Sequence, residues 1–232
     1  MRLRYELNSF KDQILEEMKQ IIIAVLIFCT FGAAAQSDPK AKSLLEETSK
    51  KMQSFQTLSA TFTFTMENVK MKISEQNSGS LLLKGEKYQV KLPDMGMQIF
   101  CDGKTVWNLM EDASQVTLSN AGEEGQGVID PTTIFNVYQE GYSYRFVEEK
   151  STGGKLVAYI DLIPEKNNSE FTKLTVGIDK SAKVVHSLVT HGKDGNLYGI
   201  YVTNLKTNLP LAESEFVFSK AKHPGIEEVD FR

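Results

Sequence analysis

The side chains that most often perform catalysis are few and scattered in this chain. His186 and His191, two of only three histidines, lie five positions apart on an expected strand, which predicts opposite faces and no shared metal ion. Asp161, Asp179 and Asp194 fall at expected strand ends or turns, where solvated carboxylates are usual. The motifs of metalloproteases, serine hydrolases and nucleotide-binding loops do not occur. We therefore expect no catalytic residues, metal or cofactor; a hydrolase with residues from distant strands is the alternative.

The composition excludes further functions. Lys and Arg number 26 against 30 Asp and Glu, a net charge of −4 without a basic block, so we expect no nucleic-acid partner. The two cysteines, Cys29 and Cys101, are too few for a disulfide framework or a thiolate metal site. With 41% hydrophobic residues among 232, the chain matches ordinary globular domains.

The residues that can act together are apolar and alternate along expected strands. Phe62, Phe64 and Met66 share one face of a strand whose other face carries threonines. Such a stripe is either the core of a β domain or the wall of a cavity for a hydrophobic ligand. The candidates for a cavity lining are Phe62, Phe64, Met66, Tyr88, Val90, Leu92, Ile99, Trp107 and Leu109.

The N-terminal region predicts export. The apolar run Ile21–Phe31 is too short to span a bilayer as a helix, but it has the length of a signal-peptide core. Ala33-Ala34-Ala35 follows as a cleavage site, which makes residues 1–35 the signal peptide and Gln36 the first mature residue. The acidic stretch before Met18 is unusual for a leader, so we expect translation to start at Met18. A genuine long leader or a retained anchor is the alternative.

Two helices are expected in the mature chain. Asp38-Pro39 opens an amphipathic segment over Lys40–Gln53. Asp130-Pro131 gives a second N-cap and first-turn proline before Thr132–Gln139. We expect the apolar side of this second helix to form part of a lid, with Ile134, Phe135 and Tyr138.

The rest of the mature chain reads as short strands separated by turns, of which Asp102-Gly103 and Asp194-Gly195 are the clearest. No repeat or linker divides it, so residues 36–232 are expected to form one mainly β domain. The expected strands are Ser59–Thr65, Gly79–Lys84, Lys87–Leu92, Met97–Cys101, Thr105–Met110, Gln115–Leu118, Tyr142–Glu148, Leu156–Ile163, Phe171–Asp179, Val184–Thr190, Tyr198–Asn204 and Glu215–Phe218.

The segment from Cys101 to Trp107 (C-D-G-K-T-V-W) resembles the D-G-K-T-x-W hairpin of the periplasmic outer-membrane lipoprotein carrier proteins, the LolA family. The surroundings agree in order. A helix and an A-T-F-T-F-T strand precede it together with G-S-L-L-L-K from Gly79, and Phe216-Val217-Phe218 comes before a final Val229-Asp230. The resemblance covers essentially the whole mature chain.

The resemblance implies an unclosed antiparallel β half-barrel covered by α-helices, and a non-enzymatic chaperone function. Such a carrier is a periplasmic monomer that shields lipoprotein acyl chains. It accepts cargo from an inner-membrane ABC-type release complex and delivers it to the outer membrane, where the acceptor is left open. Well-known members hold the lid with an arginine, whereas this chain has Lys84-Gly85-Glu86, so the lid-locking mechanism is not carried over. A periplasmic lipid-binding or sensor module of the same fold is the alternative.

Overall fold

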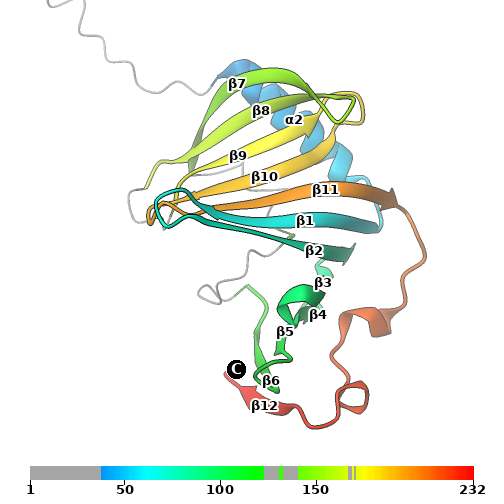
Figure 1. The fold of residues 1–232 in the computed structure, drawn as a ribbon. Coiled ribbons are helices and arrows are strands. Elements are labelled where there is room, and N and C mark those ends of the chain that lie inside the picture. Colours follow the sequence, from blue (N-terminus) through cyan, green and yellow to red (C-terminus); the bar gives the residue numbers. More distant parts are fainter. Residues whose placement is uncertain (1–37, 123–130, 133–140, 167–168, 170) are drawn as a thin grey trace, which may run out of the picture. The chain divides into compact units, whose positions relative to one another are not determined.

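Strands dominate the structure, a computed structural model that describes residues 38–122, 131–132, 141–166, 169 and 171–232 (Figure 1). One α-helix, α2 (Pro39–Gln53), precedes the sheet in this part of the chain. The strands are β1 (Leu58–Asn68), β2 (Ile73–Lys84), β3 (Lys87–Leu92), β4 (Met97–Cys101), β5 (Thr105–Met110), β6 (Gln115–Asn120), β7 (Tyr142–Thr152), β8 (Lys155–Pro164), β9 (Phe171–Asp179), β10 (Val184–Gly192), β11 (Leu197–Thr207) and β12 (Glu227–Asp230).

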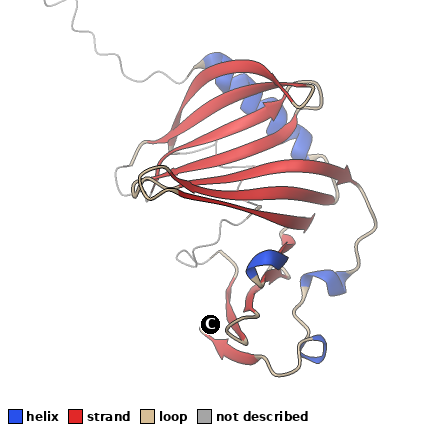
Figure 2. Ribbon diagram, in the orientation of Figure 1, coloured by secondary structure: helices blue, strands red, loops and turns tan. Residues whose placement is uncertain are grey.

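All these strands belong to one 12-stranded sheet in the order β12-β6-β5-β4-β3-β2-β1-β11-β10-β9-β8-β7. Every neighbouring pair is antiparallel except β12 and β6, which run parallel. Because β12 and β7 are the two ends of this order and do not pair, the sheet stays unclosed (Figure 2). The expected mainly β, half-barrel architecture is therefore confirmed, with one covering helix among the described residues.

Helix α2 begins where its capping residues predict. The Asp38 carboxylate accepts hydrogen bonds from the backbone N–H groups of Lys40 (2.8 Å) and Ala41 (3.4 Å), and proline occupies the first turn. Ala41 and Leu45 pack on β8, β9 and β10 against a cluster that includes Ile160. We call the side of the sheet that α2 contacts the helix face and the opposite side the outer face.

One expected strand is wrong. Of the residues expected as Glu215–Phe218, the first two end a short 3-10 helix, η3 (Glu213–Phe216), and none lies in a strand of the sheet. They belong to residues 208–226, which we call the C-terminal strap. The strap leads from β11, in the middle of the sheet, to β12, at its edge. Phe216 and Phe218 are both buried, so their alternation reflects side chains packed beneath a connecting segment.

Several expectations fall on residues outside those described. These are the signal peptide, the mature N-terminus at Gln36, and the second helix with the lid residues Ile134, Phe135 and Tyr138. Among the residues that the structure describes, no helix is both long and apolar enough to cross a bilayer.

Candidate functional site

Cross-strand pairing places many of the predicted apolar residues together on the helix face. Ala60 of β1 pairs with Leu81 of β2, Leu81 with Val90 of β3, and Val90 with Ile99 of β4. Directly paired residues point to the same side of a sheet, so these four side chains form a row across it. Tyr88 occupies the neighbouring row and packs with Ile99 in one buried cluster. The helix face is therefore apolar along this row from β1 to β4.

Phe62 and Leu92 meet over a glycine. Phe62 pairs with Gly79 of β2, and a Cβ added at Gly79 would overlap with the Phe62 ring and lie 2.9 Å from Leu92 Cδ2. The missing side chain therefore makes room for the ring. Phe64 and Met66 continue the β1 stripe and are half-buried, so they combine an apolar surface with access to solvent.

Two of the nine predicted lining residues lie on the other face. Trp107 pairs with Phe100, which belongs with Leu109 to a separate cluster under the strap residue Phe218. Val106 instead packs with the helix-face cluster of Ile99. The expectation that Trp107 and Leu109 share a face with Ile99 is therefore wrong, because β5 is apolar on both sides and only its register decides which side faces the helix.

Strand β11 adds helix-face residues that were expected in a strand but not in the site. Val202, Ile200 and Tyr198 pair with Phe62, Phe64 and Met66 respectively, and all three are half-buried. Their spacing of two along the chain could have predicted that they share one face of the strand, and pairing with β1 then places them beside Phe62, Phe64 and Met66. Seven predicted residues and these three thus share one face, namely Phe62, Phe64, Met66, Tyr88, Val90, Leu92, Ile99, Tyr198, Ile200 and Val202.

The outer face carries a buried carboxylate that was expected to be solvated. Asp161 is 1% exposed, and its oxygens accept hydrogen bonds from Arg145 Nη2 (2.6 Å), Lys173 Nζ (2.9 Å) and Thr175 Oγ1 (2.7 Å). Burial alone would raise the pKa of Asp161, but these three donors outweigh it and lower the pKa. The network links β7, β8 and β9, and Asp161 is buried within it, so we assign it a structural role.

His191 joins the Asp161 network, since its Nε2 lies 3.0 Å from Thr175 Oγ1. A β-bulge between Val185 and Ser187 interrupts the strand alternation, so His186 and His191 both lie beside outer-face carboxylates and not on opposite faces as expected. Burial lowers the pKa of both imidazoles, which favours their neutral forms. Among the described residues, no group of three or more His, Cys, Asp or Glu side chains could hold a metal ion.

Two cavities on the described surface are small. One of about 30 Å³ is lined by residues including Lys155, Asp179 and His186. Another of about 100 Å³ is lined by residues including Lys91 and Glu111. Ligand pockets usually measure about 300–1,000 Å³ and are mainly apolar, so neither cavity is a candidate for an acyl chain.

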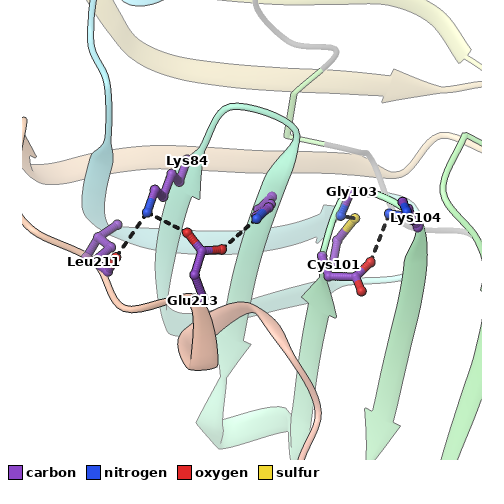
Figure 3. A network of polar contacts seen from close by, with 8 residues as sticks. Lys84, Cys101, Gly103, Lys104, Leu211 and Glu213 are labelled. Atoms are coloured by element: carbon purple, nitrogen blue, oxygen red, sulfur yellow. Dashed lines mark hydrogen bonds and ion pairs between the residues drawn. The ribbon is translucent and has the colours of Figure 1, made fainter.

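Lys84 contacts the C-terminal strap. Its Nζ donates to the Leu211 carbonyl (3.3 Å) and to Glu213 Oε1 (2.7 Å), while Lys87 Nζ lies 2.5 Å from Glu213 Oε2 (Figure 3). The two lysines lower the pKa of Glu213 to about 2 through these charge-assisted bonds. The Lys84-Gly85-Glu86 turn therefore holds the strap through its first residue.

The turn beside this anchor contains the hairpin motif. Asp102 Oδ1 accepts from the backbone N–H groups of Lys104 (2.9 Å) and Thr105 (2.8 Å), and Gly103 adopts φ +91°. A positive φ is accessible to glycine without strain, which explains the Asp-Gly pair at this turn. Cys101, directly before it, is fully buried on the helix face, and the Gly103 N–H lies 3.4 Å from its Sγ (Figure 3).

Comparisons with known proteins agree with this architecture. A protein from Neisseria gonorrhoeae (strain ATCC 700825 / FA 1090) described as an outer-membrane lipoprotein carrier protein is 27% identical over 168 residues, which are 71% of this chain and 77% of that protein. The crystal structure of an uncharacterized conserved protein from Thermus thermophilus superposes with a TM-score of 0.56 at 14% identity, covering 82% of this chain and 99% of that one, and shows the same fold. The model of the family described as outer membrane lipoprotein carrier protein LolA matches residues 53–219. The chain therefore belongs to the LolA family.

Proposed function

We propose that this protein is a periplasmic carrier that binds lipoprotein acyl chains against the helix face and moves lipoproteins from the inner to the outer membrane. The observation that carries the proposal is the apolar part of the helix face, which runs from Ile99 on β4 through Val90 and Leu81 to β1. The half-buried Phe64 and Met66 of β1 and Ile200 of β11 extend it. Membership of the LolA family supports the same function.

The energetics favour a sheltered surface of this kind. Each acyl methylene removed from water contributes about 0.8 kcal/mol, so an unshielded lipoprotein would aggregate or return to a membrane. A carrier must also release its cargo. Half-buried aliphatic and thioether side chains such as Met66 and Met97 suit this requirement, because they adapt to a flexible chain without a strong polar anchor.

The proposal includes the parts of the cycle that surround the binding face. Ile134, Phe135 and Tyr138 would form part of a cover over the bound chains. An inner-membrane ABC-type complex would supply the lipoprotein, the outer-membrane acceptor is not assigned, and the carrier would act as a monomer without catalysis. Family members are periplasmic carriers, which fits export by a signal peptide cleaved after Ala35. N-terminal sequencing of periplasmic protein should find Gln36 first, and retention of residues 21–35 would contradict this step.

The central experiment compares two glutamate substitutions on adjacent residues of β1. Phe64→Glu places a charge on the helix face. It should lower the affinity for a fluorescent acyl probe at least tenfold, since burying an unpaired carboxylate costs more than about 1–3 kcal/mol. Thr63→Glu, which points to the outer face, should leave probe affinity within about twofold. Both variants must retain the wild-type circular dichroism spectrum. Equal probe affinity for folded Phe64→Glu and wild type would refute the helix face as the binding site.

Native mass spectrometry of the periplasmic protein provides the test with natural cargo. A carrier should retain an intact acylated polypeptide in stoichiometric amount, whereas a hydrolase would release a cleaved fatty acid. Recovery of free lipid without any lipoprotein would instead favour a lipid-binding module.

A further inference from the structure

The tip of the β1–β2 hairpin exposes apolar side chains to an unusual degree. Val69 is 85% exposed and Met71 is 66% exposed, the two highest values among the large hydrophobic residues of the described chain. They alternate with Lys70 and Lys72, which are also exposed. An isolated exposed apolar residue needs no explanation, but two at the tip of one turn, each followed by a lysine, form a small amphipathic surface.

Hydrogen bonds hold this tip in place. Asn68, only 2% exposed, accepts from the Met71 backbone N–H at 3.0 Å through Oδ1 and donates to Asn196 Oδ1 at 2.6 Å through Nδ2. Asn196 belongs to the neighbouring β10–β11 hairpin, where it donates to Asp194. The two hairpins thus lie side by side (Figure 1). The apolar residues are therefore presented by an ordered turn and do not project from a loose loop.

We propose that this tip docks the protein onto the surface of an anionic phospholipid bilayer. Val69 and Met71 would enter the boundary between headgroups and acyl chains, and the ammonium groups of Lys70 and Lys72 would stay at the level of the lipid phosphates. The exposed acids nearest along the chain, Glu67 and Glu75, precede and follow this four-residue turn. The turn itself carries only positive charge, which complements an anionic surface.

The size and chemistry of the tip favour a membrane over a protein partner. A stable protein interface needs about 800 Å² from each partner and is usually centred on Trp, Tyr or Arg. Residues Val69–Lys72 include none of these and are too few for such an area. Shallow insertion of two apolar side chains between basic ones gives weak, reversible and salt-dependent attachment. Docking of this kind does not depend on what the helix face binds, so it goes beyond the proposed carrier function.

Tryptophan fluorescence can locate the inserted residue. Trp107 is the only tryptophan of the chain, so a Met71→Trp variant in a Trp107→Phe background reports on the tip alone. The control, Val147→Trp in the same background, occupies a 47% exposed position on β7. With vesicles of phosphatidylglycerol and phosphatidylethanolamine, emission at position 71 should shift to the blue and be quenched by brominated acyl chains, while position 147 should not change.

Vesicle flotation of the protein as purified from the periplasm, with its natural tryptophan, tests the contributions of the lysines and of the apolar residues separately. Each lysine near an anionic surface contributes about fivefold, so Lys70→Gln/Lys72→Gln should bind about 25-fold more weakly and lose its dependence on salt. Val69→Ser/Met71→Ser should also lose binding, and Val147→Ser should not. All variants share one N-terminus, so any contribution of the N-terminus to vesicle binding cancels when variant and wild type are compared. Unchanged flotation of the serine pair, or emission at position 71 that stays typical of water, would overturn membrane docking and point to a protein partner.

Discussion

Lys84 Nζ lies 2.7 Å from Glu213 Oε1 and thereby joins the end of β2 to the C-terminal strap. The same carboxylate binds Lys87 at the start of β3, so one side chain spans the β2–β3 turn. The Gln89 side chain adds a 2.6 Å hydrogen bond to the Glu215 carbonyl. Because β12 extends the sheet beyond β6 only after the strap has crossed from β11, these contacts help to hold the edge of the sheet in place.

The first prediction concerns the pH dependence of this anchor. Since the pKa of Glu213 is lowered to about 2, from about 4.3 in an unfolded chain, the stabilisation is complete above about pH 4.5 and disappears as the pH falls toward 2. Glu213→Gln should therefore be less stable than wild type in urea at pH 7, and the two curves should converge between pH 4.5 and 2. Glu215→Gln is the control, and a difference between wild type and Glu213→Gln that stays constant over this pH range would contradict the assignment.

The second prediction tests the close approach of Phe62 to Gly79. A Cβ at position 79 would overlap with the ring, so Gly79→Ala should lower the free energy of unfolding by about 1–3 kcal/mol. Ser80→Ala, on the outer face of the same strand, should change it by less than about 0.5 kcal/mol. A smaller partner should relieve the overlap, so Phe62→Leu should cost less in the Gly79→Ala background than in wild type. Simple additivity in this double-mutant cycle would argue against the contact.

The third prediction concerns the buried Asp161. Asp161→Asn leaves Arg145 and Lys173 without their shared carboxylate and should reduce the free energy of unfolding by about 1–3 kcal/mol. Glu148→Gln breaks the exposed 3.2 Å pair with Lys150 and should cost at most about 0.5 kcal/mol. Thermal unfolding of both variants provides the comparison. Equal losses of unfolding free energy in the two variants would mean that the buried Asp161 network stabilises the fold no more than the exposed pair does.

Local chemistry made much of this fold predictable. Asp38-Pro39 marks the start of α2, and Asp102-Gly103 marks a hairpin, because capping and turn formation depend on residues adjacent in sequence. Burial of Asp161 could not be predicted in this way. Its partners come from β7 and β9. The sequence around Asp161 therefore predicts a solvated carboxylate, and the side chain becomes enclosed only when these distant strands pair.

The orientation of strand β5 in the candidate site also could not be predicted from residues adjacent in sequence. Val106 and Trp107 are both apolar and adjacent, so alternation alone cannot decide which of them faces α2. The pairing of Trp107 with Phe100 decides it. The strap then covers that side with Phe218, whose ring centroid lies 6.2 Å from that of Phe100. A sequence pattern can thus identify a strand while leaving its orientation to long-range contacts.

The last prediction separates the two faces of β5. Trp107→Ala removes a large side chain from the cluster beneath the strap and should lower the free energy of unfolding by about 3 kcal/mol. The strap should also become easier to cleave by trypsin after Lys220 and Lys222. Affinity for an acyl probe should nevertheless stay within about twofold of wild type, because Trp107 points away from the helix face.

Val90→Asp is the matched variant on that other face, in the row that contains Ile99. This substitution should lower the affinity for the acyl probe at least tenfold, since an unpaired carboxylate is costly next to an acyl chain. Trypsin should still cleave the strap at the wild-type rate. Wild-type Trp107 emission supplies an independent check. A brominated acyl chain bound on the helix face should leave this emission less quenched than that of Trp introduced at position 90. Strong quenching of Trp107 would place the ligand on the outer face and reverse the assignment of the two sides.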